Sequence, residues 1–198
     1  APLGAVTVRE VGLRDGLQAI ALTLPTATKL DWLRGLHAAG VREVEVGSFV
    51  PARLLPQLAD TAEVVAHARR HPGLTVMALV PNLKGAEAAF AAGVHKLTVP
   101  VSASAAHSMA NVRRTPAQMV DEVAAIVFAR DAQAPGTKVE VGISTAFGCT
   151  LQGRVDEGEV LRLAAALAAA GADEVGLSDT TGMAHPAQVR RLFTALKA

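Results

Sequence analysis

A segment that recurs three times along the chain restricts the possible folds more than any other feature of the sequence. Residues 38–46, 91–99 and 169–177 each join an alanine-rich stretch to a glycine and then to a run of mainly apolar residues. Alanine favours a helix, and a glycine allows the left-handed turn by which a chain leaves a helix. Each repeat is therefore interpreted as the end of a helix that leads into a strand.

Six strand–helix units of this kind can be placed on the sequence, because a helix-like pattern follows every predicted strand. The first helix is predicted at residues 28–39. The predicted strands are residues 6–11, 43–46, 75–80, 96–99, 138–143 and 174–177. Later helix starts are predicted at Thr115-Pro116, Asp156 and His185-Pro186, which have the composition of N-terminal caps.

Regular alternation of strands and helices predicts an α/β fold with a parallel sheet, either an open doubly wound sheet or a TIM (β/α)8 barrel. No glycine-rich dinucleotide or phosphate-binding motif follows the first strand, which argues against the open nucleotide-binding type. A complete barrel needs eight units and typically about 250 residues. We therefore expect residues 1–198 to be a single, incomplete TIM-barrel domain with about six units present and the last two missing.

Composition excludes several other classes. Hydrophobic residues make up 51% of the chain, too many for a disordered protein, and the longest apolar run, residues 163–170, is too short to span a bilayer. A net charge of +1 and 3% aromatic residues argue against nucleic-acid binding. We expect no signal peptide and no membrane association, and the single cysteine, Cys149, excludes an internal disulfide. A reducing compartment is expected, with the bacterial cytoplasm as the default.

Polar residues follow the predicted strands at the points where side chains of a parallel barrel would meet at one face. Three carboxylates and one guanidinium are delivered there by separate segments: Asp15, Glu45, Asp179 and Arg14. Carboxylates repel one another unless a cation or an arginine compensates them. Oxygen ligands favour a hard divalent ion, so Mg²⁺ or Mn²⁺ is the expected cofactor.

Structural interpretations compete with this one. Asp15 is also suited to capping a turn, and Arg14 to a simple ion pair with Glu45. Cys149 has the pattern of a packed thiol. The histidines show no close pair at metal-ligand spacing. Three of them, His37, His67 and His71, fall in helix-like stretches and are interpreted as surface residues, whereas His107 follows a strand.

Several motifs together resemble those of one enzyme family. Residues 10–18 (EVGLRDGLQ), 45–51 (EVGSFVP), 80–85 (VPNLKG), 147–150 (FGCT) and 177–182 (LSDTTG) are similar to strand-end motifs of 3-hydroxy-3-methylglutaryl-CoA (HMG-CoA) lyases in the DRE-TIM metallolyase superfamily. The resemblance covers essentially the whole chain. It implies a metal-dependent carbon–carbon lyase that cleaves HMG-CoA, or a close β-hydroxy acyl-CoA, to acetyl-CoA and acetoacetate. It also implies a homodimer and a place in leucine degradation and ketone body metabolism.

The resemblance assigns roles to matching residues. Asp15 would be a metal ligand, and Arg14 would bind substrate and stabilise the enolate of the departing acetyl-CoA. Glu45 and Asp179 would belong to the catalytic group. The residues expected near substrate are Gln18, Ser48 and Thr180.

The family's His-x-His pair of metal ligands, its asparagine ligand and its catalytic cysteine in a glycine-rich loop do not occur in these 198 residues. Cys149 lies outside that loop motif and does not take the role. The chain alone is therefore expected to be inactive.

Two alternatives stay open. A Claisen-type synthase of the same superfamily, such as an isopropylmalate synthase, would share Arg14 and Asp15, although residues 16–18 and 48–51 favour the lyase. A non-catalytic module that binds an acyl group or a metal is the second alternative.

Overall fold

The computed structural model describes residues 6–197, which fold into two compact units. The first unit contains the chain up to Val80 together with Lys84–Leu97. The second contains Pro81–Leu83 and the chain from Thr98 onward. The expectation of a single domain stays a prediction.

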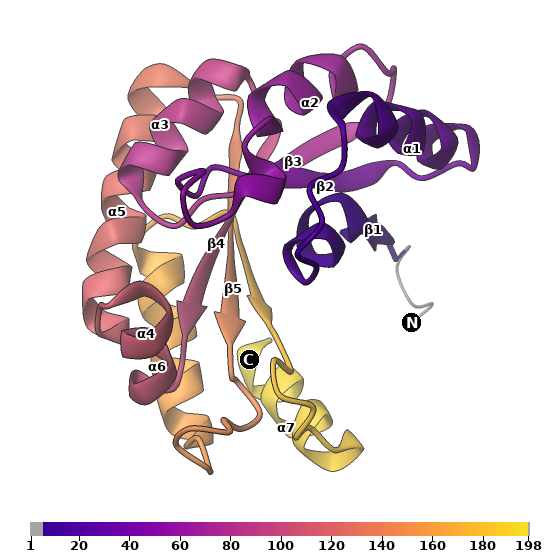
Figure 1. Cartoon of the computed structure of the whole chain (residues 1–198). Coiled ribbons are helices and arrows are strands. Elements are labelled where there is room, and N and C mark those ends of the chain that lie inside the picture. The colour runs from indigo at the N-terminus through magenta and orange to yellow at the C-terminus, as the bar shows by residue number, and fades with distance from the viewer. Residues whose placement is uncertain (1–5, 198) are drawn as a thin grey trace. The chain divides into compact units, whose positions relative to one another are not determined.

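The first unit holds three parallel strands in the order β1-β2-β3. Pairing of Arg9 with Glu43 and of Glu10 with Val44 sets the register between the first two strands. Helices α1 and α2 lie beside each other against these strands (Figure 1). The elements are β1 (Arg9–Glu10), η1 (Gly12–Gly16), α1 (Thr26–Ala38), β2 (Glu43–Ser48), η2 (Pro56–Leu58), α2 (Thr61–Ala68), β3 (Thr75–Leu79) and α3 (Leu83–Ala92).

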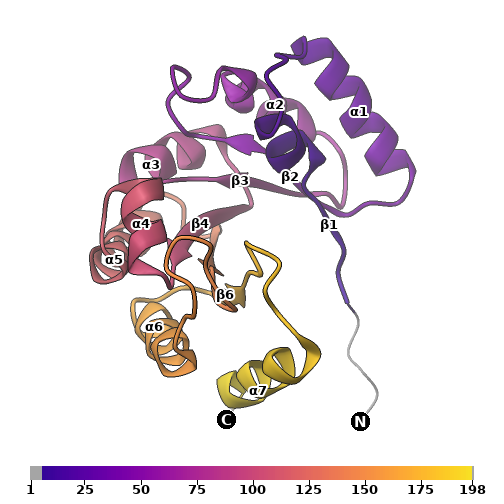
Figure 2. The same cartoon turned by 60° about the horizontal axis from the view of Figure 1, so that its bottom comes forward.

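The second unit continues with strands in the order β4-β5-β6, of which β5 and β6 pair in parallel. Helix α6 packs against both of these strands and lies between α5 and α7 (Figure 2). The elements are β4 (Lys96–Ser102), whose first two residues belong to the first unit, α4 (Ala105–Val112), α5 (Pro116–Gln133), β5 (Lys138–Ser144), α6 (Glu157–Ala169), β6 (Glu174–Leu177) and α7 (Pro186–Leu196).

Local sequence signals account for where the helices begin and end. Thr115 caps α5 in a reciprocal capping box with Gln118, and the Asp156 side chain accepts a hydrogen bond from the first turn of α6. The three repeat glycines have positive φ angles of 92°, 79° and 92° at Gly40, Gly93 and Gly171. These predicted caps and turns are confirmed.

The boundaries of several elements differ from prediction. The first strand is Arg9–Glu10 instead of residues 6–11, because within this predicted range these two residues alone pair with β2, while Val6 and Val8 are exposed. Strands β2, β4 and β5 extend to serines at positions 48, 102 and 144. Polar residues expected in loops therefore lie at strand ends, where the backbone ladder restrains them.

Each unit buries its own apolar layer. Val44, Val76 and Ala78 of the first sheet are fully covered, as are Val141 and Ile143 of the second. No helix within residues 6–197 is long and apolar enough to cross a membrane.

Candidate functional site

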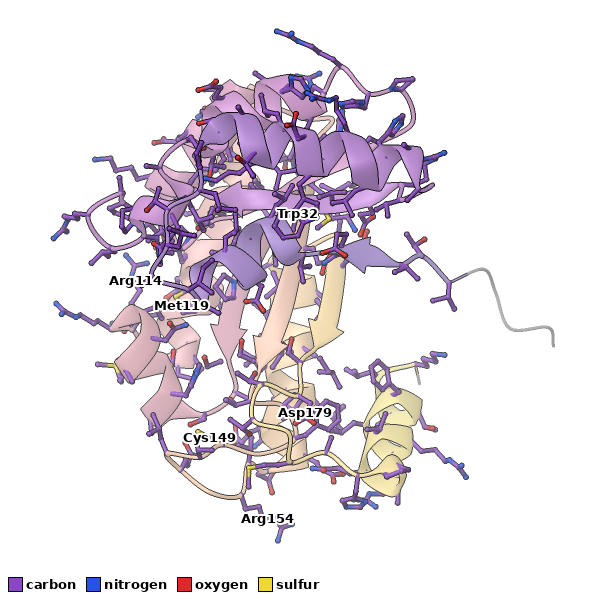
Figure 3. All side chains as sticks on the ribbon, turned by 45° about the vertical axis from the view of Figure 1, so that its right-hand side comes forward. Trp32, Arg114, Met119, Cys149, Arg154 and Asp179 are labelled. Atoms are coloured by element: carbon purple, nitrogen blue, oxygen red, sulfur yellow. The ribbon has the colours of Figure 1, made fainter. Side chains whose placement is uncertain are left out.

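The segment after β1 forms a wide helical turn that carries the Arg-Asp pair. The carbonyl oxygen of Val11 accepts hydrogen bonds from the backbone N–H groups of Arg14, Asp15 and Gly16, at 3.0, 2.7 and 3.5 Å. The last of these spans five residues, the spacing of a π-helical turn, which is rare and is found often at functional sites. Figure 3 shows Trp32 of α1 beside this turn.

A glycine at position 12 is required by the packing of this turn. A Cβ atom there would lie 2.7 Å from both the Trp32 ring and Glu10 Oε1. The same Glu10 oxygen accepts the Gly12 N–H at 2.6 Å. Glu10 therefore supports the turn from the strand side.

Arg14 joins two carboxylates. Its Nε donates to Glu45 Oε2 at 2.5 Å, and its Nη1 donates to Asp15 Oδ1 at 2.7 Å. The Arg14 and Glu45 side chains are only 16% and 2% exposed, whereas Asp15 is 64% exposed. The turn and β2 thus build a cluster with a buried anion, a central cation and an anion that faces solvent.

One oxygen of this cluster is unsatisfied. Glu45 Oε1 is buried and has no hydrogen-bond partner among residues 6–197. A buried acceptor without a partner costs about 1–3 kcal/mol, so such atoms point to a ligand or a water. Pairing of β2 with β3 is irregular between Glu45 and Ser48, and strand irregularities of this kind often lie next to active sites.

Ser48 ends β2 and is 2% exposed. Its Oγ accepts the Val50 N–H at 3.2 Å, and its own N–H donates to Thr61 Oγ1 at 3.1 Å. Gln18, just after η1, is exposed. Contacts of Ser48 and Gln18 with a substrate stay predictions.

Replacing Gly47 by alanine is expected to lower the free energy of unfolding by about 1–3 kcal/mol, the usual cost of overpacking. The added Cβ would lie 2.8 Å from Thr61 Cγ2 and would displace Thr61, whose Oγ1 accepts the Ser48 N–H. Urea unfolding measures the change. Gly35→Ala is the matched control, because nothing lies within 4 Å of its added Cβ inside α1, and it should stabilise by about 0.5–1 kcal/mol. Equal effects of the two substitutions would contradict the packing argument.

In the second unit, Asp179 shapes the loop after β6. Its Oδ1 and Oδ2 accept the N–H groups of Met183 and Ala184 at 2.9 and 3.2 Å, and the residue is exposed. Figure 3 places Asp179 and Cys149 in neighbouring loops of this unit, which are joined by a hydrogen bond from Thr181 Oγ1 to the Gly148 carbonyl. The carboxylate therefore has a structural role, whatever chemistry it also performs.

Thr180 follows Asp179, and its Oγ1 accepts the Thr145 N–H at 2.8 Å. The structure thus brings together Arg14, Asp15 and Glu45 in the first unit, and Asp179 and Thr180 share a loop in the second. A common pocket that contains both groups stays a prediction.

Cys149 is a buried free thiol, which agrees with its interpretation as a packed thiol. Burial alone raises its pKa, but polar contacts with the Ser104 side chain and with the backbone of Gln152 and Leu151 outweigh this, so the pKa lies below its ordinary value. The Leu151 N–H contacts Sγ at 3.4 Å. The thiol has no exposed surface, and we assign it to packing.

Three histidines interpreted as surface residues lie together and are partly buried. The rings of His37 and His67 lie 4.8 and 5.4 Å from that of His71. Burial, followed by the charges of His37, His67 and Arg34, lowers the pKa of His71. Sequence spacing hides this cluster because His37 belongs to a different helix.

A divalent ion would find suitable donor chemistry at Asp15, whose carboxylate is exposed beside Arg14. However, residues 6–197 contain no group of three or more His, Cys, Asp and Glu side chains that could hold a metal ion. The described residues therefore do not make a complete metal site.

Lys29 is a residue that the sequence pattern did not reveal. It is 2% exposed, and its Nζ donates to the Gln57 carbonyl at 2.6 Å and to Asp60 Oδ1 at 2.5 Å. Gln57 in turn donates to the Ile20 carbonyl at 2.5 Å. This clamp ties the segment that follows the Arg-Asp turn to the loop before α2. Its one sequence signal is that Lys29 lies one helical turn before the buried Leu33.

Comparison with known proteins relates this geometry to a family. The model of the HMGL-like family matches residues 5–198. The chain is 36% identical over 193 residues to hydroxymethylglutaryl-CoA lyase YngG of Bacillus subtilis, covering 98% of this chain and 64% of that protein. It is 39% identical over 191 residues to a 3-hydroxy-3-isohexenylglutaryl-CoA/hydroxymethylglutaryl-CoA lyase of Pseudomonas aeruginosa, covering 96% and 63%.

The structural comparison agrees. An HMG-CoA lyase of Acinetobacter baumannii, solved with coenzyme A and 3-methylmalate, matches with a TM-score of 0.87 and 38% identity over 94% of this chain and 60% of that one. The predicted α/β fold class, with six strand–helix units of a TIM barrel, is confirmed. The chain spans less than two thirds of the length of these relatives. A family model that matches nearly every residue, together with this fold, shows that the chain belongs to the HMGL-like family.

Proposed function

We propose that this chain contributes to a metal-dependent carbon–carbon lyase that cleaves HMG-CoA, or a close β-hydroxy acyl-CoA, to acetyl-CoA and a 3-oxo acid. The observation that carries the proposal is the Arg14 cluster, in which a largely buried guanidinium is held between Glu45 and Asp15. The names of the similar lyases, and the coenzyme A bound in one of them, support the reaction class and the acyl-CoA substrate.

Cleavage of the substrate combines the transfer of a proton with the shift of one electron pair. The tertiary hydroxyl loses its proton and becomes the ketone of the oxo acid while the adjacent carbon–carbon bond breaks. The electron pair of that bond passes to the acetyl-CoA fragment as its enolate, which then takes a proton on carbon. Negative charge therefore develops on the thioester oxygen, and this is the charge that the protein must stabilise.

Arg14 is suited to that task. Glu45 and Asp15 hold its Nε and Nη1, and no partner of Nη2 is present among residues 6–197. A guanidinium fixed at two points is preorganised, so its remaining N–H donors need little reorganisation when the enolate forms. Glu45 Oε1 offers a buried acceptor beside it for a hydrogen bond from the ligand.

The metal is proposed with one protein ligand in this chain, Asp15. Mg²⁺ or Mn²⁺ would acidify the substrate hydroxyl when bound. The described residues do not supply a complete ligand set for this ion. We also propose roles in substrate binding for Gln18, Ser48 and Thr180, a catalytic role for Asp179, a homodimeric state and a cytoplasmic location.

The synthase alternative is not favoured, since the similar curated proteins are named as lyases. One similar protein suggests a different acyl group for the substrate. An (R)-citramalyl-CoA lyase of Chloroflexus aurantiacus is 37% identical over 198 residues, covering 95% of this chain and 62% of that protein. Its name gives another hydroxy acyl-CoA as substrate, so we propose that the shape of the pocket decides which acyl group is cleaved.

The test compares residues 1–198 alone with the longest natural form of the chain, each supplied with Mg²⁺ or Mn²⁺. HMG-CoA and citramalyl-CoA are offered for cleavage, and acetyl-CoA with a 2-oxo acid is offered for condensation. We expect cleavage by the longest form only. Condensation would replace the lyase by the synthase, and binding without turnover in every form would favour the non-catalytic module. Turnover by residues 1–198 alone would show that the absent family ligands are not needed.

A further inference from the structure

Thr145 adopts a backbone conformation that its residue type disfavours. Its φ angle is +57°, and a β-branched side chain in this left-handed region is a genuine outlier. Arg113, at φ +56°, is the other non-glycine residue of this kind within residues 6–197, but it ends helix α4, where such a conformation is common. Thr145 lies in no helix end and is 1% exposed. Such strain persists only where the surroundings over-determine it, and it clusters at functional sites.

Hydrogen bonds use every polar atom of Thr145. Its N–H donates to Thr180 Oγ1 at 2.8 Å, and its Oγ1 accepts the Ser104 N–H at 3.1 Å and donates to the Ser144 carbonyl at 2.6 Å. Its carbonyl oxygen accepts the Gly148 N–H at 3.3 Å. One buried residue thus connects the segments that follow β4, β5 and β6, all within the second unit.

The connected segments are themselves cross-linked. Ser104, the N-cap of α4, donates its hydroxyl to Gln152 Oε1 at 2.9 Å, and Thr181 Oγ1 donates to the Gly148 carbonyl at 3.0 Å. The loops after β5 and β6 run beside each other in Figure 2. Displacing Thr145 would therefore move several loop residues together.

The bond from Thr145 fixes the direction in which the Thr180 hydroxyl can donate. Its Oγ1 accepts the Thr145 N–H, so the oxygen is held in place while its own proton stays available to donate. Thr180 is exposed, and no hydrogen bond donated by its hydroxyl to any of residues 6–197 is present. Such a hydroxyl suits an acceptor oxygen on a ligand.

We infer that Thr145 is a positioning residue, which holds the Thr180 hydroxyl so that it donates to an oxygen of the acyl group of the acyl-CoA substrate. The inference rests on the proposed lyase function. It goes beyond that function by assigning a role to a buried residue that does not itself touch substrate.

The test is a double-mutant cycle with Thr145→Val and Thr180→Val in the longest natural form of the chain. Each single variant should raise KM for HMG-CoA about 10-fold, the size expected for one neutral hydrogen bond, with kcat changed much less. Because Thr145 acts through Thr180, the double variant should also raise KM about 10-fold, whereas independent effects would raise it about 100-fold. Additive effects on KM would overturn the inference.

Two further variants separate positioning from folding. Thr145→Ser retains the hydroxyl and should keep KM within about 2-fold of the parent. Thr194→Val is the matched control, because Thr194 is exposed on helix α7 and lies outside the three connected loops, so this substitution should leave KM unchanged. A Thr145→Ser variant as impaired as Thr145→Val would contradict the role of the hydrogen bonds.

Hydrogen exchange provides a readout that does not depend on catalysis. Thr180→Val should accelerate exchange of the Thr145 amide, because that amide loses its acceptor, and should leave the amides of helix α6 unaffected. If the parent cleaves no acyl-CoA, the proposed function fails, whereas slow Thr145 exchange in Thr180→Val overturns the positioning contact itself.

Discussion

Replacing Arg14 by alanine in the longest natural form of the chain should lower kcat for HMG-CoA cleavage at least ~10²-fold, with a smaller change in KM, by analogy with the loss of one oxyanion donor. The guanidinium is positioned for charge that develops only as the bond breaks, so its loss affects the transition state more than substrate binding. Steady-state kinetics on HMG-CoA measures both parameters. A near-normal kcat would remove Arg14 from the mechanism.

The alanine variant also leaves Glu45 buried without its partner, which by itself destabilises the fold. Arg14→Lys separates the two effects, because it keeps the positive charge but cannot hold two carboxylates with a planar fork. It should fold and still lose most of kcat. Arg9→Ala is the matched control, since Arg9 of β1 pairs with Glu43 of β2 at 2.7 Å, outside the proposed chemistry. A loss of kcat in Arg9→Ala equal to that in Arg14→Ala would indicate a general effect of strand ion pairs.

Replacing Lys29 by methionine is expected to lower the free energy of unfolding by about 3 kcal/mol, at the lower end of the range for breaking a buried ion pair because Asp60 is partly exposed. Methionine fills similar space but leaves Asp60 Oδ1 and the Gln57 carbonyl without the Lys29 donor, while Thr26 still donates to Asp60 Oδ2. For a chain of this length, such a loss corresponds to a fall in Tm of about 6–12 °C. Thermal and urea unfolding measure it.

The control for Lys29 lies on the same helix. Arg34→Met breaks an exposed pair with Asp31 and should change the free energy of unfolding by about 0.5 kcal/mol or less. Adding Asp60→Asn to Lys29→Met removes the stranded charge, so the two substitutions together should cost less than their sum, with a coupling of about 1–3 kcal/mol. Strict additivity, or a loss no larger than in Arg34→Met, would show that the clamp does not stabilise the fold.

Elements that depend on neighbouring residues could be predicted well. The turns at the repeat glycines and the caps at Thr115 and Asp156 are short-range signals, because the atoms that make each contact lie within a few residues of one another. Strand lengths were less predictable. Val6 and Val8 have a strand-like sequence, yet β1 begins only at Arg9. A strand needs a partner, and of residues 6–11 only Arg9 and Glu10 pair with β2.

The candidate site shows the same division. Arg14 and Asp15 are adjacent in the chain, and motif resemblance was enough to select them together with Glu45. Their distances follow from the register in which β1 and β2 pair. The sequence did not single out Lys29 and Thr145, because a lysine in a helix and a threonine after a strand are both common. Burial of the Lys29 amine and the left-handed backbone of Thr145 make them exceptional.

From the amino acids in order one can derive the alternating fold, the helix boundaries and the family, since these depend on local propensities and on motifs read along the chain. The pairing of Arg14 with a buried Glu45, the Lys29 clamp and the convergence of three loops on Thr145 depend on contacts between residues about 30 or more positions apart. Such contacts exist only after the strands have paired and excluded water, because burial is what makes each of those polar partners necessary.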